Sequence, residues 1–276
     1  MNSFNSRLSH HIADKHSWLC VGLDINPENL HGKDSTLTEL KSHTKSVIDA
    51  TRDFAAAYKP NLAFFERWGS KGFAWLEETM EYIGRQTLII GDAKRGDIGH
   101  TATQYAISLF DHFGFDAVTL NPYMGRDTIE PFIQNPEKGV FVLCRTSNQS
   151  GNDLQNLNTN GKRLFESVAE YCANLNENNN IGLVVGATNP EEIQLVRSKA
   201  PGLPLLIPGI GAQGGALEAS LTAGNTNGAA LINVSRGISF AGDQGEEAIH
   251  DAAKDYVEKM RKIAKNLDLC YMNDDF

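Results

Sequence analysis

The feature that most constrains the fold is a series of short apolar segments, bounded by polar or turn-forming residues. Most are apolar along their whole length, which is typical of strands buried on both faces of a parallel sheet. Segments with helical periodicity lie between them, and this alternation also indicates a parallel sheet. The predicted strands cover residues 18–23, 55–59, 87–91, 117–120, 140–144, 181–186, 203–207 and 229–234.

Eight parallel strands separated by helices predict a closed (β/α)8 barrel of the α/β class, the TIM barrel. An open, doubly wound sheet is the alternative, and the lack of a G-x-G-x-x-G motif after the first strand weakens it. The chain has 276 residues, and one barrel needs about 250. We therefore predict a single domain over residues 1–276, with a short N-terminal extension and a C-terminal tail. Helices are predicted at residues 36–51, 70–84, 162–175, 190–199, 216–223 and 246–264, and another begins at Thr101.

Composition and charge exclude several classes of protein. The formal net charge of −9 argues against a nucleic-acid partner, because no sizeable basic patch offsets it. Cys20, Cys144, Cys172 and Cys270 are far apart and lack a zinc-binding spacing, so we expect reduced thiols. No signal-peptide core or membrane-length apolar run is present. We therefore expect a cytoplasmic protein without a membrane partner, with solvated side chains at residues 10–11, a pair of histidines.

The densest group of charges follows the third predicted strand. Asp92, Lys94, Arg95 and Asp97 lie within six residues, where a strand ends and a helix is about to begin. That end of a parallel strand is where ligands bind in α/β folds. Asp92 and Lys94 are two residues apart, so in an extended chain they face the same side, and Asp97 can reach back after a turn. The alternative is a surface cluster of ion pairs, and we expect Arg95 to face outward in such a pair.

In a barrel, all eight strand ends meet on one face. Polar residues follow six of the predicted strands, an arrangement that scattered surface charges would not produce. Their convergence favours a functional site over a surface cluster. The residues expected on this face are Asp24, Lys59, Asp92, Lys94, Ser147, Gln213 and Arg236, with Asp97 just beyond the third strand.

Two glycine-containing segments near the end of the chain indicate a phosphate site. PGIGAQGG at residues 208–215 follows the seventh strand, and VSRG at residues 234–237 follows the eighth. Barrels commonly bind phosphate with these two loops, and Arg236 adds a planar fork that can pair two oxygens. No metal site is apparent, because Lys94 and Arg95 stand among the few carboxylates. The pattern predicts charge-based chemistry on a phosphorylated small molecule, with a lysine as proton donor or nucleophile.

Four sequence runs resemble the orotidine 5'-phosphate decarboxylase family, in its longer bacterial form. The resemblance extends from LCVGLD to Arg236, nearly the whole chain. It implies decarboxylation of orotidine 5'-monophosphate to uridine 5'-monophosphate and CO2, the final step of de novo pyrimidine biosynthesis. It also implies that the enzyme uses no metal and no organic cofactor. The runs are DAKRGDIGHT at residues 92–101, KPNLAFFE at 59–66, PGIGAQGG at 208–215 and SRG at 235–237.

The same resemblance implies roles for the charged residues after the first three strands. Lys94 is expected to protonate C6 of the pyrimidine as CO2 leaves. Asp92 is expected to lie beside the substrate carboxylate and to hold Lys94. Asp24 and Lys59 are expected to bind ribose hydroxyls and to complete the charged network. The matching positions of Asp97 and Thr101 imply that they reach the partner subunit's site, in a homodimer with shared active sites.

The resemblance assigns the remaining residues to substrate binding. Ser147 is expected to contact the pyrimidine ring, while Gln213 and Arg236 hold the 5'-phosphate. Pro208 is expected among the binding residues, and the loop after it is expected to close over the phosphate. Some family members place a tyrosine just after the phosphate-binding glutamine, whereas residues 214–215 here are both glycine. Phosphate binding is therefore expected to depend more on backbone N–H groups in this chain.

Three other activities remain open from the sequence. A metal-dependent sugar-phosphate decarboxylase or aldol synthase can use the same D-x-K-x-x-D array. A Schiff-base lyase would use Lys59 or Lys94 as its nucleophile. A barrel that only binds nucleotide would be expected to lack the motif lysine, and Lys94 is present.

Overall fold

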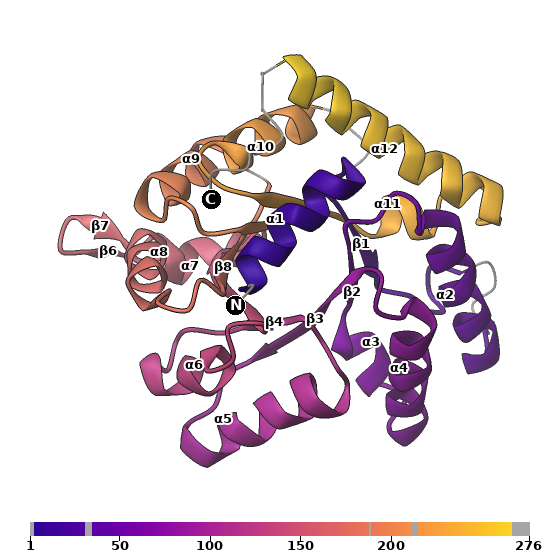
Figure 1. Cartoon of the computed structure of the whole chain (residues 1–276), viewed down its shortest axis with the longest axis horizontal. Helices are drawn as coiled ribbons and strands as arrows, with labels where there is room; N and C mark the ends of the chain where they lie inside the picture. Colours follow the sequence, from indigo (N-terminus) through magenta and orange to yellow (C-terminus); the bar gives the residue numbers. More distant parts are fainter. Residues whose placement is uncertain (1–2, 31–34, 188, 211–214, 267–276) are drawn as a thin grey trace.

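The computed structural model describes residues 3–30, 35–187, 189–210 and 215–266 (Figure 1). Eight parallel strands form a closed barrel in the order β1-β10-β9-β8-β5-β4-β3-β2. This closed sheet confirms the predicted TIM barrel and excludes the open doubly wound sheet. The strands are β1 (Leu19–Leu23), β2 (Ala57–Pro60), β3 (Leu88–Arg95), β4 (Ala117–Leu120), β5 (Gly139–Arg145), β8 (Ile181–Val185), β9 (Leu205–Pro208) and β10 (Ala230–Val234).

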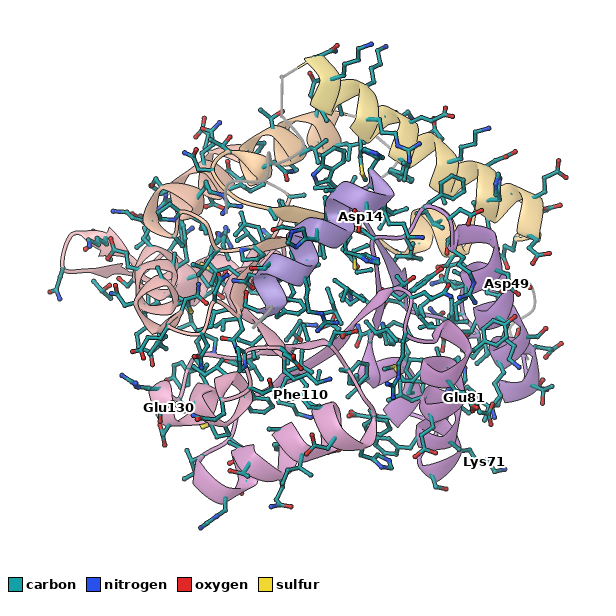
Figure 2. All side chains as sticks on the ribbon, in the orientation of Figure 1. Asp14, Asp49, Lys71, Glu81, Phe110 and Glu130 are labelled. Atoms are coloured by element: carbon teal, nitrogen blue, oxygen red, sulfur yellow. The ribbon has the colours of Figure 1, made fainter. Side chains whose placement is uncertain are left out.

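Helices surround the barrel as an outer ring (Figure 1). Their outer faces are polar: Asp49, Lys71 and Glu81 lie at the outside of the ring in Figure 2 and are exposed. The helices are α1 (Phe4–Lys15), α2 (Leu37–Thr51), α3 (Leu62–Glu66), α4 (Ser70–Ile83), α5 (Gly99–Ala106), the π-helix η1 (Ile107–His112), α6 (Arg126–Ile133), the 3-10 helix η2 (Gln149–Gly151), α7 (Asn152–Gln155), α8 (Leu164–Leu175), α9 (Pro190–Lys199), α10 (Gly215–Asn225), α11 (Arg236–Ser239) and α12 (Glu246–Asn266).

The barrel core is filled by side chains from the strands themselves. Phe141 on β5 is completely buried. Gly182 on β8 makes room for the Phe141 ring, because a Cβ at residue 182 would lie 2.7 Å from a ring carbon. Tight packing of this kind makes the barrel a rigid support for the residues at its ends.

The third strand is longer than predicted. The sequence pattern placed its end at residue 91, whereas β3 continues to Arg95. Its pairing with β4 becomes irregular between Gly91 and Arg95, and Lys94 adopts a positive φ of 46°. Asp92, Lys94 and Arg95 therefore lie on a distorted strand, and Asp97 lies just beyond its end. A side chain explains the distortion, since the Lys94 N–H donates to Thr119 Oγ1 (2.9 Å).

Several short elements were not predicted. Helix α6 was not predicted because it contains Pro131 in its interior, and proline normally ends a helix. The segment at residues 147–161 is rich in Asn and Gly, and it contains η2 and α7. A hairpin of two short strands follows, β6 (Asn158–Thr159) and β7 (Lys162–Arg163).

Helix α1 packs against the end of the barrel where the strands begin. Phe4 is fully buried and meets Phe141 edge to face, with ring centroids 5.9 Å apart. His10 is exposed as predicted, but the prediction for His11 was wrong. His11 is half-buried, and its Nε2 has no hydrogen-bond partner among the described residues. Burial, followed by the nearby charge of Lys15, lowers the pKa of His11.

The three described cysteines, Cys20, Cys144 and Cys172, are free and buried. Burial raises the pKa of Cys20 and of Cys172 to about 12, so both thiols remain protonated at neutral pH. Cys270 and the predicted C-terminal tail from residue 267 lie outside the described residues. Within the described ranges, no helix combines the length and apolar character needed to span a membrane.

Candidate active site

The centre of the site is the Asp92 carboxylate on β3, which contacts two lysines. Lys59 from β2 lies with its Nζ 2.8 Å from Asp92 Oδ2, and Lys94 Nζ lies 2.5 Å from Asp92 Oδ1. Thr119 on β4 also donates from its Oγ1 to Asp92 Oδ1 (3.0 Å). Three neighbouring strands thus supply one hydrogen-bonded array. The strand ends predict the contributions of β2 and β3, but not that of Thr119 on β4.

The two lysines differ in their access to solvent. The Lys59 side chain is 5% exposed, whereas the Lys94 side chain is 49% exposed. Asp92 lies between them and is 10% exposed. Lys94 is therefore the lysine that a bound molecule can reach, and Lys59 supports the array from below.

Mutual attraction keeps the buried groups charged. Burial alone would raise the pKa of Asp92, but Lys59 and then Lys94 hold it well below its usual range. Burial would likewise lower the pKa of Lys59, and Asp92 followed by Asp24 raises it above its ordinary value. Asp92 is ionised and Lys59 is protonated over the whole physiological range.

The backbone at Lys94 is in the left-handed region, which is costly for a residue with a side chain. Such a conformation costs on the order of 1–3 kcal/mol and persists where surrounding contacts enforce it. Here the contact is Thr119, whose Oγ1 accepts the Lys94 N–H and donates to Asp92. The same threonine thus fixes both the strand distortion and the carboxylate.

Asp24 follows β1 and joins the edge of the same array. Its charge contributes to the raised pKa of Lys59. Its Oδ1 is buried and has no hydrogen-bond partner among the described residues. A buried acceptor without a donor is costly, so this oxygen is suited to receive a hydroxyl of a bound molecule.

Asp97 and Thr101 do not join the array within one chain. Asp97 Oδ1 accepts the N–H of Ile98 (2.8 Å), and no ion pair of Asp97 occurs among the described residues. Thr101 is exposed on α5. Both residues stand beside Ile98, which is 58% exposed. The structure therefore leaves these two predicted site residues on an open surface next to the array.

The remaining predicted residues lie along β5, β9 and β10. Pro208 ends β9, and its carbonyl accepts the Ala187 N–H (2.9 Å). Arg236 begins α11, is exposed, and has no ion-pair partner in the described ranges. Ser147 lies next to Gly209, where a Cβ would be 3.6 Å from the Ser147 Cβ. Gln213 lies outside the described residues.

Arg95 points away from the array. It forms an ion pair with Glu66 and lies over the Tyr105 ring, 5.2 Å from its centroid. The predicted ion pair is confirmed, although the side chain is only 23% exposed. Arg95 is therefore a structural residue on the outer side of β3.

Sequence reasoning missed Thr119 and the buried pair Arg145–Glu192. Thr119 is a β-branched residue in an apolar strand, so its pattern gives no reason to suspect a site contact. Arg145 is 8% exposed and its Nε lies 2.8 Å from Glu192 Oε2. The available signal was an arginine directly after the apolar run of β5, two positions before the predicted binding residue Ser147.

The described side chains offer no metal cage: no three of their His, Cys, Asp or Glu side chains gather closely enough to hold an ion. The charged groups that do gather are two lysines, the Asp92 carboxylate between them and Asp24 at their edge, so their formal charges balance. The Lys94 ammonium is the solvent-exposed member of this group, and it can meet an anionic group or developing negative charge.

Comparisons with known proteins agree with this geometry. The chain is 48% identical over 270 residues to the orotidine 5'-phosphate decarboxylase of Natronomonas pharaonis, covering 94% of this chain and 99% of the relative. It is 44% identical over 255 residues to that of Herpetosiphon aurantiacus, covering 90% of each. The solved OMP decarboxylase of Leishmania donovani superimposes with a TM-score of 0.83 at 43% identity, covering 95% of this chain and 98% of that one.

The family model for the orotidine 5'-phosphate decarboxylase / HUMPS family matches residues 17–250. The match includes every strand of the barrel and every predicted site residue. The chain therefore belongs to the orotidine 5'-phosphate decarboxylase / HUMPS family.

Proposed function

We propose a mechanism in which Lys94 protonates C6 of the pyrimidine while Asp92 and Lys59 keep it charged and positioned. The activity is the decarboxylation of orotidine 5'-monophosphate to uridine 5'-monophosphate and CO2, in pyrimidine biosynthesis. The observation that carries the mechanism is the single buried carboxylate of Asp92 held between two lysines, only one of which is accessible.

The chemistry follows from the charges of the array. Loss of CO2 leaves a carbanion at C6, which the pyrimidine ring barely delocalises. A fixed ammonium group stabilises that negative charge as it develops and then supplies the proton. Lys94 is half-exposed at the mouth of the barrel, so its ammonium can reach a bound base. Asp92 stays ionised beside it and would repel a substrate carboxylate in the same place.

Substrate binding is assigned to the residues around this centre. Asp24 takes a ribose hydroxyl through its buried, unpaired Oδ1, and Ser147 contacts the pyrimidine ring. Arg236 and Gln213 hold the 5'-phosphate beside Pro208, at the loops where barrels bind phosphate. Binding energy from this remote phosphate can then be used at the reacting carbon.

We assign the functional unit to a homodimer in which Asp97 and Thr101 complete the partner's site. Neither residue has a role within its own chain's array. Exposed apolar side chains lie near Asp97, which supports contact with a second protein surface. Ile98 is 58% exposed, and Met124 is 44% exposed and lies close to Gly96, where a Cβ would be 3.7 Å from the Met124 Cε.

The proposal includes a cytoplasmic location and a reaction without metal or organic cofactor. The test is the ultraviolet change of orotidine 5'-monophosphate with purified protein, with and without EDTA. We expect fast conversion to uridine 5'-monophosphate that EDTA leaves unchanged. Conversion that EDTA abolishes would overturn the metal-free mechanism. No conversion by folded protein would overturn the activity and would favour a sugar-phosphate substrate or nucleotide binding alone.

A further inference from the structure

The mechanism leaves one buried ion pair unused, between Arg145 at the end of β5 and Glu192 in the first turn of α9. The two side chains are 10% and 8% exposed, and the Arg145 Nε lies 2.8 Å from Glu192 Oε2. Removing two charges from water is costly, so such pairs are weak evidence for stability. The alternative is that the pair fixes the geometry of the chain segment that follows Arg145.

Arg145 also holds the residues that follow it in the chain. Its NH1 donates to the carbonyl of Thr146 (2.9 Å) and to Gln155 Oε1 (3.2 Å), and its NH2 donates to Asn152 Oδ1 (2.7 Å). Three of its four side-chain hydrogen bonds are thus directed at residues 146–155, and the fourth is to Glu192. Five N–H donors in a rigid fork make arginine suited to such a centre.

Gln155 completes the connection to Thr146. Its Oε1 accepts the Thr146 N–H (2.9 Å), and its Nε2 donates to Thr146 Oγ1 (2.7 Å). Gly151 allows this close packing, because a Cβ there would lie 3.0 Å from Thr146 Oγ1 and 3.1 Å from Arg145 NH1. The N–H, the carbonyl and the hydroxyl of the residue before Ser147 are therefore all fixed.

The same carboxylate also contacts the far end of this segment. Arg163 NH1 lies 3.6 Å from Glu192 Oε1, and its Nε lies 3.0 Å from Glu166 Oε1. Glu192 therefore contacts an arginine at each end of the segment 146–163, which contains η2, α7 and the β6–β7 hairpin. A segment held at both ends keeps its first residues in one conformation.

Ser147 directly follows the fixed residue Thr146, so its position is constrained as well. It lies against Gly186, which follows β8, and a Cβ at residue 186 would be 2.8 Å from the Ser147 Cβ. It also borders Gly209, which follows β9 and has a φ of 98°. Ser147 thus stands between the array and the phosphate loops, where a pyrimidine ring would lie under the proposed function.

We propose that Arg145 and Glu192 are positioning residues that act through Gln155 and Thr146 to place Ser147 against the base of the nucleotide. The inference rests on the proposed function, because it takes the ring contact of Ser147 from it. It goes beyond that function by assigning a recognition role to a network of residues that do not touch the substrate.

The test is a double-mutant cycle on kcat/KM for orotidine 5'-monophosphate. Arg145→Lys keeps the charge but loses the fork, and Ser147→Ala removes the ring contact. We expect each to lower kcat/KM about tenfold, and the double variant to lower it about tenfold and not hundredfold. Gln155→Ala, a half-exposed site that leaves the ion pair intact, should show the same coupling to Ser147 if Arg145→Lys fails to fold.

A binding measurement separates positioning from general loosening of the fold. We expect Arg145→Lys and Gln155→Ala to weaken uridine 5'-monophosphate about tenfold and to leave the affinity for ribose 5-phosphate, which lacks the base, unchanged. Equal weakening of both ligands would overturn the proposal, as would additive effects with Ser147→Ala.

Arg197 is the matched control. It is 4% exposed and donates to the carbonyls of Leu203 (2.5 Å) and Ala229 (3.1 Å), and to that of Gly224, away from the strand ends that bear the site. Arg197→Lys should lower Tm and leave kcat/KM unchanged. If the wild-type protein does not convert the substrate, the proposed function fails. If it does and the cycle is additive, only the positioning role fails.

Discussion

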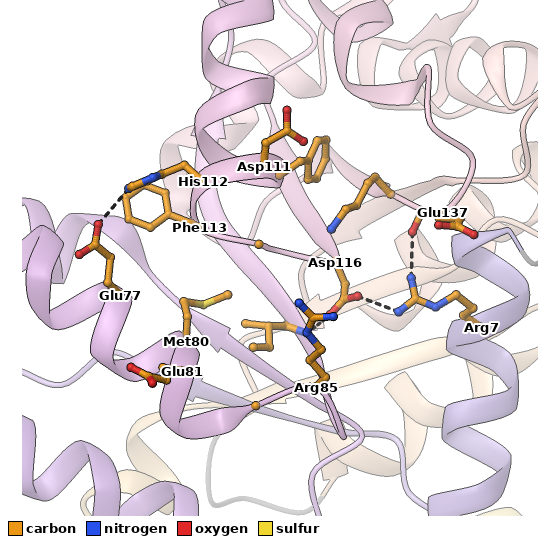
Figure 3. Close-up of a pocket in the computed structure, with 15 residues that line it drawn as sticks. Arg7, Glu77, Met80, Glu81, Arg85, Asp111, His112, Phe113, Asp116 and Glu137 are labelled. Atoms are coloured by element: carbon orange, nitrogen blue, oxygen red, sulfur yellow. Dashed lines mark hydrogen bonds and ion pairs between the residues drawn. The ribbon is translucent and has the colours of Figure 1, made fainter.

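The two ends of the barrel both carry many charged side chains, but they arrange them differently. At the end where the strands finish, two lysines share the buried carboxylate of Asp92. At the end where the strands begin, a cavity of about 830 Å³ is lined by ionisable side chains of both signs, two pairs of which are in contact (Figure 3). Arg7 contacts Asp116 at 2.7 Å, and His112 contacts Glu77 at 2.9 Å.

The difference shows that cavity size and charge count do not define an active site. The pairs in Figure 3 are one-to-one, and the His112–Glu77 pair is more than half exposed. Exposed pairs of this kind contribute little to stability. Asp92 and Lys59 are shielded from solvent, and the ammonium group of Lys94 remains accessible beside them. Barrel enzymes likewise keep their chemistry at this end and use the other end for stability.

The largest effect is expected from removing the accessible lysine. Lys94→Ala should lower kcat by about 10^4-fold or more, because it removes both the proton donor and the charge opposite the carbanion. Uridine 5'-monophosphate should still bind. The control is Lys138→Met in the opposite cavity, which should leave kcat unchanged. A folded Lys94→Ala protein that turns over substrate normally, or fails to bind uridylate, would contradict the assigned role.

The second prediction concerns the residues that stand outside the array. Lys94→Ala and Asp97→Ala proteins should each be inactive alone. Mixed and re-associated in equal amounts, they should recover up to about a quarter of wild-type activity, since half of the dimers are hybrids with one intact site each. Verified hybrids that remain inactive would place Asp97 and Lys94 in the same chain's site and would remove the proposed sharing.

A smaller effect is expected at Thr119, which fixes the distortion of β3. Thr119→Val keeps the shape but loses the donor to Asp92 and the acceptor for the Lys94 N–H. We expect kcat/KM to fall roughly 10- to 100-fold, with Thr119→Ser close to wild type. Steady-state kinetics on both variants test this. If Thr119→Val retains full activity, the left-handed backbone at Lys94 is maintained by other contacts.

Most of the fold could be predicted from the sequence for a physical reason. Barrel strands are buried on both faces, so they appear as uninterrupted apolar runs, and eight such runs were identified. Helix α6 was missed because its interior Pro131 contradicts local propensity, while packing on the barrel outweighs it. The end of β3 was misplaced because a side chain from another strand, Thr119, satisfies the backbone at Lys94.

The candidate site was predictable where geometry follows from strand ends. Asp24, Lys59, Asp92 and Lys94 each follow or end an apolar run, so their convergence required only the barrel topology. The Arg145–Glu192 pair joins residues 47 positions apart, and no local pattern indicates which acid a buried arginine will contact. Long-range polar networks of this kind are visible only once the chain is folded.

The smallest expected effect is on the pH dependence of stability, at the end of the barrel opposite the site. Burial lowers the pKa of His11, which lies at the end of the barrel where the strands begin. The unfolded chain therefore binds a proton at this residue more readily than the folded one. The contribution of neutral His11 to the free energy of unfolding is therefore fully present above the ordinary histidine pKa of about 6.5, and it is lost as pH falls below that value. His11→Gln should flatten the fall in Tm between roughly pH 7 and pH 5 without altering kcat. Parallel Tm profiles for the two proteins would show that His11 binds a proton as readily in the folded protein as in the unfolded chain. An altered kcat would show that the two ends of the barrel are coupled.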